Sequence, residues 1–133
     1  MKIKILDVTA VNGERFVRFQ TEVGQGGGVA KWMNEENPIV NYSYDVELDT
    51  DKTISEVLKN TYHQVPEHAL TVNGNKVLMF GVLESIEDDG MAYLRLYPDS
   101  LVMIDVGDAN FSAGENVVLE VDRSELEITA QGL

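Results

Sequence analysis

The fold class follows most directly from the stretch IKILDVTAVNGERFVRFQTEV, which occupies residues 3–23. Apolar and polar residues alternate on both sides of Asn12-Gly13, a dipeptide that favours the tight turn of a β-hairpin. On the second side, Val17 and Phe19 fall on one face of an extended chain and Arg18 falls on the other. A period of two predicts paired strands with one buried face.

The same pattern returns along most of the chain. Alternating or apolar runs occupy residues 42–48, 77–86, 92–97, 101–106, 117–121 and 126–130. Short strands at this spacing predict a mainly β protein, an antiparallel small barrel or sandwich. The second half reads as strand, hairpin, strand, connector, strand and strand, which is similar to an OB-type barrel. We expect one compact domain over 1–133, with two subdomains, 1–65 and an OB-like 66–133, as the alternative.

One helix is expected within this β pattern, which makes the predicted class a β-rich α+β. Thr53-Ile54-Ser55-Glu56 fits a capping box, in which a hydroxyl and a carboxylate bind the amides of the first turn. Ile54, Val57 and Leu58 would share one helical face. These signals predict a short helix near residues 54–61.

A faint internal repeat bears on the number of domains. Val46-Glu47-Leu48-Asp49 resembles Leu119-Glu120-Val121-Asp122, and the hairpin around Gly13 resembles a second one around Gly90. Any two β-hairpins share much of this patterning. Duplication and coincidence both remain open at this point.

The charge is unevenly distributed. The formal net charge is −13, and residues 84–133 carry twelve acidic side chains against two basic ones. Such a field repels nucleic-acid phosphates and anionic membranes and favours a cationic partner. Cysteine is absent, which excludes disulfides, thiolate metal sites and thiol catalysis. With no signal-peptide core and no apolar run long enough for a bilayer, a cytoplasmic protein is expected.

We therefore hypothesise a non-catalytic binding protein that docks a basic protein surface, of the immunity or inhibitor type. A solvated outer face that keeps the protein soluble is the competing interpretation. The predicted partner-binding residues are the acidic ones on outer faces and turns of the second half: Glu87, Asp88, Asp89, Asp99, Asp105, Asp108, Glu120, Asp122, Glu125 and Glu127. If the strands on either side of Asp122-Arg123-Ser124 pair, the last four carboxylates lie on one face.

The alternative function is a module that binds a sugar or small neutral ligand through aromatic residues, with Tyr93 and Tyr97 as the candidates. No catalytic residue, metal site or cofactor is predicted, because His63 and His68 lack a nucleophile or a matching set of ligands. The sequence leaves the identity of the partner and the oligomeric state open.

Overall fold

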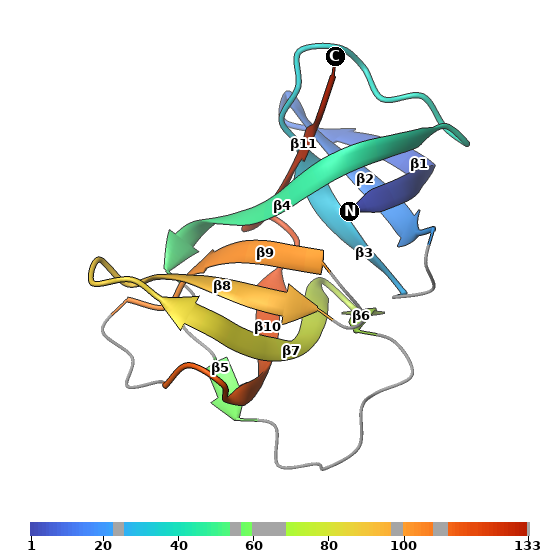
Figure 1. Cartoon of the computed structure of the whole chain (residues 1–133). Coiled ribbons are helices and arrows are strands. Elements are labelled where there is room, and N and C mark those ends of the chain that lie inside the picture. Colours follow the sequence, from blue (N-terminus) through green and yellow to red (C-terminus); the bar gives the residue numbers. More distant parts are fainter. Residues whose placement is uncertain (23–25, 54–56, 60–68, 97–99, 108–111, 133) are drawn as a thin grey trace.

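The computed structural model describes residues 1–22, 26–53, 57–59, 69–96, 100–107 and 112–132. Strands are the regular elements of these residues (Figure 1), which confirms the predicted mainly β architecture. They are β1 Lys2–Val11, β2 Glu14–Thr21, β3 Gly27–Trp32, β4 Ser43–Thr53, β5 Val57–Lys59, β6 Leu70–Asn73, β7 Lys76–Ile86, β8 Met91–Leu96, β9 Ser100–Asp105, β10 Asn116–Asp122 and β11 Leu126–Ala130. Within these described ranges, no helix is long and apolar enough to cross a membrane.

Five of the strands close into a barrel. Strands β1, β2, β3, β11 and β4 follow one another in hydrogen-bonded order, and β4 pairs with β1 to complete the circle. The β3–β11 pair is parallel, and the other neighbouring pairs are antiparallel. Closure satisfies the backbone groups that an open sheet leaves at its edges. The barrel therefore combines strands from the two ends of the described chain, as Figure 1 shows.

The second group of strands repeats part of this arrangement. Strands β7, β8 and β9 form an antiparallel meander, and β10 returns to pair with β7, as β4 does with β1. Strand β5 pairs with β10, and β6 pairs with β7. The end of β4 lies parallel to β9, so this long strand belongs to both groups. This order follows the faint sequence repeat, but β11, which was expected to complete an OB-like C-terminal half, belongs to the closed barrel of β1–β4. The OB-like C-terminal half and the division into domains stay predictions.

Alternation along the strands builds the core as expected. In β2, Val17 and Phe19 are buried while Arg18 is exposed. Trp32 of β3 is also buried, and its ring meets Tyr44 edge to face, with 5.2 Å between ring centroids. Burying one large apolar side chain contributes about 1.5–3 kcal/mol. The inward faces of the strands therefore supply most of the stabilisation.

The hairpin that decides the fold is present. Val11 of β1 pairs with Glu14 of β2, which leaves Asn12-Gly13 as a two-residue loop. Both loop residues have positive φ, 51° for Asn12 and 80° for Gly13. A type I′ turn requires this conformation, and its twist matches the flanking strands.

The predicted helix is wrong where the structure can be compared with it. Residues Val57–Lys59 form β5, which pairs with Val117, Val118 and Leu119 of β10. Residues 54–56 and 60–61 lie outside the described residues. Apolar residues such as Val57 and Leu58 fit a short strand as well as a helical turn. The strand is favoured here because the edge of β10 forms backbone hydrogen bonds with it. Tertiary pairing thus overrides a local capping signal.

Arg15 fixes the connection between β3 and β4. Its guanidinium donates hydrogen bonds to the backbone oxygens of Asn34, Glu35 and Glu36 and to the side chain of Asn37. The indole nitrogen of Trp32 donates to Glu36 O at 2.7 Å. This connection is consequently anchored to the barrel, although Glu35 and Glu36 are exposed.

Candidate functional site

Four of the predicted partner-binding residues come together at one end of the β7–β9 meander. Glu87, Asp88 and Asp89 form the turn between β7 and β8, and all three are exposed. Asp105 ends β9 opposite Met91, the first residue of β8. Figure 1 shows the β7–β8 connection projecting from the side of the molecule. We refer to Glu87, Asp88, Asp89 and Asp105 as the acidic tip.

Backbone and side-chain hydrogen bonds hold the acidic tip in place. Glu87 N donates to Met91 O at 2.7 Å, and Val106 N donates to Gly90 O at 2.9 Å. The carboxylates take part as well. Asp89 Oδ1 accepts from Met91 N at 3.0 Å, and Asp105 Oδ1 accepts from Gly107 N at 2.9 Å. Among the described residues, no side-chain hydrogen bond or ion pair involves the carboxylates of Glu87 and Asp88, and both side chains are exposed.

Gly90 sets how closely this turn approaches the end of β9. Its φ is +88°, which side-chain-bearing residues rarely adopt, and a Cβ added there would lie 2.8 Å from the carbonyl oxygen of Gly107. Two independent reasons therefore favour glycine at this position: the backbone conformation and the close contact with Gly107. The contact keeps the two turns of the acidic tip together.

The carboxylates of the acidic tip that the structure describes do not converge on one point. Among the described residues, no group of three or more His, Asp or Glu side chains is placed to hold a metal ion. Hard cations need several oxygen ligands that converge on one point. Exposed carboxylates that do not converge produce a negative field over an area, which is the property that attracts a basic surface.

Of the other predicted acidic residues, those on β10 and the one on β11 lie in different groups of strands. Strand β10, with Glu120 and Asp122, pairs with β7 and β5, whereas β11, with Glu127, pairs with β3 and β4. Pairing of β10 with β11, the condition under which the last four carboxylates would share one face, is therefore not met in the described strands. Strand β10 belongs to the β7–β10 group, and β11 pairs with β3 and β4 of the barrel. Residues Asp122-Arg123-Ser124 therefore connect the two groups of strands. Glu125 precedes β11, and Asp99 and Asp108 lie outside the described residues.

Sequence reasoning missed the acidic residues of β4. Asp45 and Glu47 are exposed on this strand, and Asp49 lies opposite Glu127 of β11. Like charges opposite each other reduce the stability of a sheet. The alternation of β4 placed these carboxylates on its outer face, but only the β4–β11 pairing brings Glu127 beside them. A second acidic surface thus spans β4 and β11.

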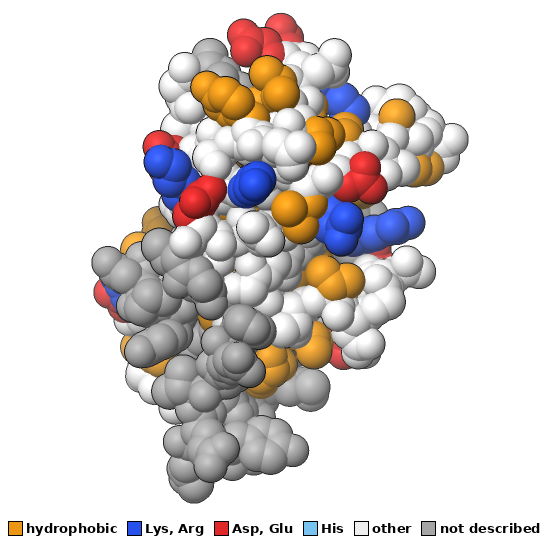
Figure 2. Space-filling view, turned by 90° about the vertical axis from the view of Figure 1, so that its right-hand side faces the viewer, with side chains coloured by type: hydrophobic (Ala, Val, Ile, Leu, Met, Phe, Trp, Pro, Cys, Tyr) orange, Lys and Arg blue, Asp and Glu red, His pale blue; other side chains and the backbone are white. Residues whose placement is uncertain are grey.

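Not every face of the molecule is acidic. Figure 2 shows one face on which lysine and arginine side chains lie in a band across the middle, with hydrophobic and acidic side chains among them. The chain has only ten lysine and arginine residues against twenty-three acidic ones. On this face, basic side chains therefore lie beside acidic and hydrophobic ones, in a chain that is acidic overall.

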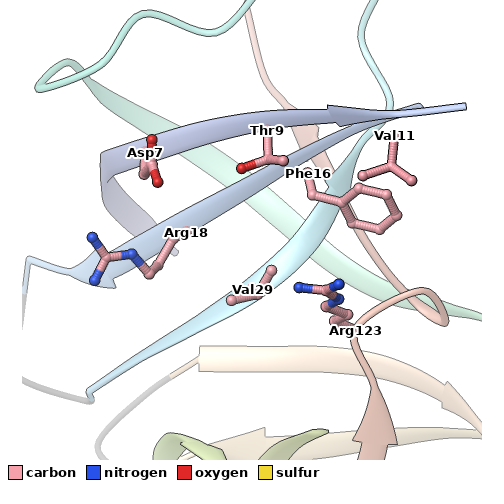
Figure 3. A pocket seen from close by; sticks show the side chains of 7 residues that line it. All are labelled: Asp7, Thr9, Val11, Phe16, Arg18, Val29 and Arg123. Atoms are coloured by element: carbon pink, nitrogen blue, oxygen red, sulfur yellow. The ribbon is translucent and has the colours of Figure 1, made fainter. Parts of the chain in front are cut away.

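Two adjoining hollows lie on the outer face of the β1–β2–β3 sheet and share Val11, Phe16 and Arg123. The first has a volume of about 190 Å³ and is shown in Figure 3. The second has a volume of about 330 Å³. We call them together the arginine groove. The first hollow is lined by Asp7, Thr9, Val11, Phe16, Arg18, Val29 and Arg123, and the second by Val11, Asn12, Glu14, Phe16, Asn75, Asp122, Arg123 and Ser124.

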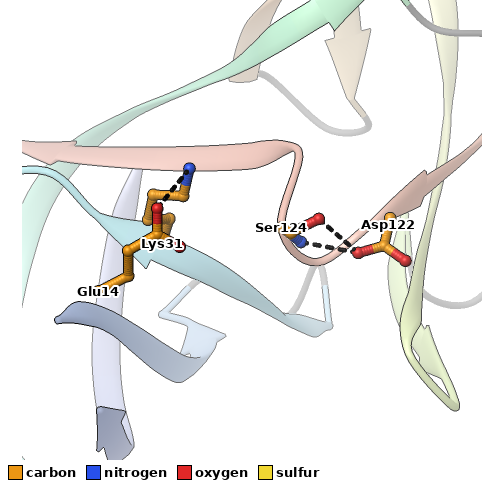
Figure 4. Close-up of polar contacts among 4 residues, drawn as sticks. All are labelled: Glu14, Lys31, Asp122 and Ser124. Atoms are coloured by element: carbon orange, nitrogen blue, oxygen red, sulfur yellow. Dashed lines mark hydrogen bonds and ion pairs between the residues drawn. The ribbon is translucent and has the colours of Figure 1, made fainter. Parts of the chain in front are cut away.

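The two carboxylates that line the second hollow, those of Glu14 and Asp122, are engaged in hydrogen bonds or ion pairs within the protein. Asp122 Oδ1 accepts hydrogen bonds from Ser124 N at 2.9 Å and from Ser124 Oγ at 2.7 Å, and Lys31 pairs with Glu14 (Figure 4). The Nζ of Lys76 lies 3.9 Å from Asp122 Oδ2. These contacts fix the turn that presents Arg123.

The hydrogen bonds of Ser124 should be visible in the titration of Asp122. The Ser124 amide, and then its hydroxyl, lowers the pKa of Asp122, with smaller contributions from Lys76 and Arg123. A carboxyl group whose pKa is lower in the folded state stabilises the fold above its unfolded-state pKa, and this contribution is lost as the pH falls through the folded-state pKa.

We expect Ser124→Ala to raise the pKa of Asp122 part of the way towards its usual range, because the backbone amide remains. Carboxyl-detected NMR titration measures the change. The stability difference between the two proteins should shrink as Asp122 becomes protonated. An unchanged Asp122 pKa in the variant contradicts this role of the hydroxyl.

The aromatic alternative is only partly represented in the described residues. Tyr93 lies half-buried on the outer face of β8, between Ser85 of β7 and Met103 of β9. Tyr97, His63 and His68 lie outside the described residues. A Tyr93–Tyr97 platform therefore stays a prediction.

Comparisons with known proteins identify no relative. No family model matches the chain, and neither a curated protein nor a solved structure matches it.

Proposed function

We propose that the protein is a non-catalytic binding protein, of the immunity or inhibitor type, that docks a basic protein surface through the acidic tip. The observation that carries the proposal is the grouping of Glu87, Asp88, Asp89 and Asp105 on one projecting and internally hydrogen-bonded end of the molecule. A cytoplasmic location belongs to the same proposal.

The charge of the acidic tip supports docking, because described basic residues of the chain do not neutralise Glu87, Asp88 and Asp89. In the part of the chain that the structure describes, no lysine or arginine forms an ion pair with Glu87, Asp88 or Asp89. Their field is thus directed at solvent, where it accelerates the approach of a cationic partner and rejects anionic ones.

The rigidity of the acidic tip supports the same function. A partner that binds a held turn does not have to order it, so less conformational entropy is lost on binding. Asp89 and Asp105 orient the turns, whereas Glu87 and Asp88 present exposed carboxylates that no other described residue pairs with. The division of roles suggests which residues to exchange in an experiment.

The test is the charge-reversed double variant Glu87→Lys, Asp88→Lys, which leaves Asp89 and Asp105 in place. Its matched control is Glu35→Lys, Glu36→Lys, which has the same net charge and alters an exposed, anchored connection of the other strand group. The partner is isolated on immobilised wild-type protein, and its association rate is measured at about 50 mM and about 300 mM salt.

At low salt, the tip variant should associate roughly tenfold more slowly or worse, and the difference should narrow at high salt because the charges are screened. The control should stay close to wild type. If both variants slow association equally, net charge and not the acidic tip governs binding, and the proposed site is wrong.

A further inference from the structure

We propose that the arginine groove binds a small ligand in which one anionic group, a phosphate or a carboxylate, is attached to a flat ring. This site is separate from the acidic tip. It lies on the outer face of the closed barrel, whereas the acidic tip ends the β7–β9 meander.

Two arginines supply the recognition of the anion. Arg18 of β2 and Arg123 of the β10–β11 turn line the same hollow (Figure 3). Among the described residues, neither guanidinium forms an ion pair with a carboxylate. Guanidinium groups bind phosphate and carboxylate through two parallel hydrogen bonds, which gives direction as well as attraction.

Two of the three acidic residues of the groove, Glu14 and Asp122, line only the second hollow. Glu14 is paired with Lys31 at 3.7 Å, and Asp122 with Lys76 at 3.9 Å. Asp7 is opposite Arg18 in the β1–β2 register, and its Oδ1 accepts a hydrogen bond from Val8 N. Two arginines against one carboxylate outside an ion pair leave the first hollow positive, in a chain whose net charge is −13.

The floor of the groove suits a flat apolar ring. Phe16 of β2 is half-buried on the outer face of the sheet, and Val11 and Val29 line the first hollow with it. The guanidinium carbon of Arg123 lies 5.9 Å from the centre of the Phe16 ring, so the arginine is held over this floor. A ligand ring can pack on the apolar floor or stack on the guanidinium plane while its anionic group meets the arginines.

The size and the surroundings favour a small ligand over a polymer. Volumes of about 190 and 330 Å³ approach the lower end of ordinary small-molecule sites. A long polyanion would also extend over the acidic surfaces, which repel it at low salt. One ring with one anionic group satisfies the arginines without that penalty.

The experiment measures binding to the whole protein by NMR or calorimetry, with adenosine 5′-monophosphate and benzoate as the probes. Adenosine and benzyl alcohol provide the same rings without the anion. We expect saturable binding of at least one anionic probe with a dissociation constant below about 1 mM. Its uncharged counterpart should bind at least about tenfold more weakly, and the two pairs separate a phosphate ligand from a carboxylate ligand.

Three variants locate the site. Arg18→Gln, Arg123→Gln together should weaken binding at least about tenfold, which corresponds to roughly 1.4 kcal/mol. Phe16→Leu, which keeps an apolar side chain, should weaken it several-fold. Lys2→Gln removes an exposed cation outside the groove and should leave affinity unchanged. Circular dichroism verifies that each variant is folded.

The proposal is overturned if neither anionic probe binds saturably, or if the uncharged rings bind equally well. It is also overturned if Lys2→Gln weakens binding as much as the arginine double variant, or if a single-stranded oligonucleotide binds the groove more tightly than the anionic probes. Each of these failures leaves docking at the acidic tip untouched, because the two sites share no residue.

Discussion

Ile128→Ala is expected to lower the free energy of unfolding by about 2–5 kcal/mol, the usual range for a fully buried isoleucine. Ile128 has no exposed surface and lies in β11 between Leu48 of β4 and Trp32 of β3. Its carbonyl oxygen also accepts a hydrogen bond from Met33 N at 3.0 Å. The loss would leave a cavity at the point where the last described strand closes the barrel. Urea unfolding measures the change.

Two further variants separate this role from a general sensitivity of β11. Thr129→Ala alters the next residue, which is only half-buried. It should lower the free energy of unfolding much less than Ile128→Ala does. Ile128→Val should cost about 0.5–1.5 kcal/mol and remains measurable if the alanine variant does not fold. Hydrogen exchange should accelerate in β3 and β4 as well as in β11. Acceleration confined to 126–130 contradicts the closed barrel.

Gly90→Ala is expected to lower the free energy of unfolding by about 2–5 kcal/mol. This range is the sum of about 1–2 kcal/mol for a left-handed backbone conformation and about 1–3 kcal/mol for overpacking. Gly90 has a φ of +88°, and three backbone atoms of Gly107 lie within 3.1 Å of the position that a Cβ would take. Backbone atoms cannot rotate away as a flexible side chain can. The two turns of the acidic tip would have to separate, which chemical denaturation and local amide shifts both detect.

Gly13→Ala is the matched control, because Gly13 has a similar φ of +80° and nothing within 4 Å of the Cβ position. It should incur the backbone penalty alone, about 1–2 kcal/mol. The difference between the two variants measures the Gly90–Gly107 contact. Equal losses would show that this contact contributes nothing to the acidic tip.

Local order was largely predictable from the sequence. Period-two alternation placed Val17 and Phe19 inside and Arg18 outside, and Asn12-Gly13 marked the first hairpin, because both signals act between neighbouring residues. The helix near 54–61 was predicted from an equally local signal. It was wrong over Val57–Lys59 because the edge of β10, distant in sequence, provides hydrogen bonds to this segment.

Long-range pairing explains what the sequence did not reveal. The parallel β3–β11 contact joins Lys31 and Glu127, and no pattern near either residue specifies the other. The same crossover separates Glu120 from Glu127 and carries Arg123 over Phe16, so it divides the predicted acidic face and creates the arginine groove. The grouping at the acidic tip was easier to predict from the sequence, because three of its residues are consecutive. Only Asp105 joins them through a longer-range contact, the β8–β9 pairing.

The most direct test of docking at the acidic tip is a hydrogen-exchange footprint of the protein in complex with the basic partner isolated at low salt. Docking at the tip predicts that amides of residues 86–91 and 104–107 exchange more slowly in the complex, while those of residues 34–37 are unchanged. A footprint confined to the arginine groove, the β4–β11 face or the β3–β4 connection would contradict it.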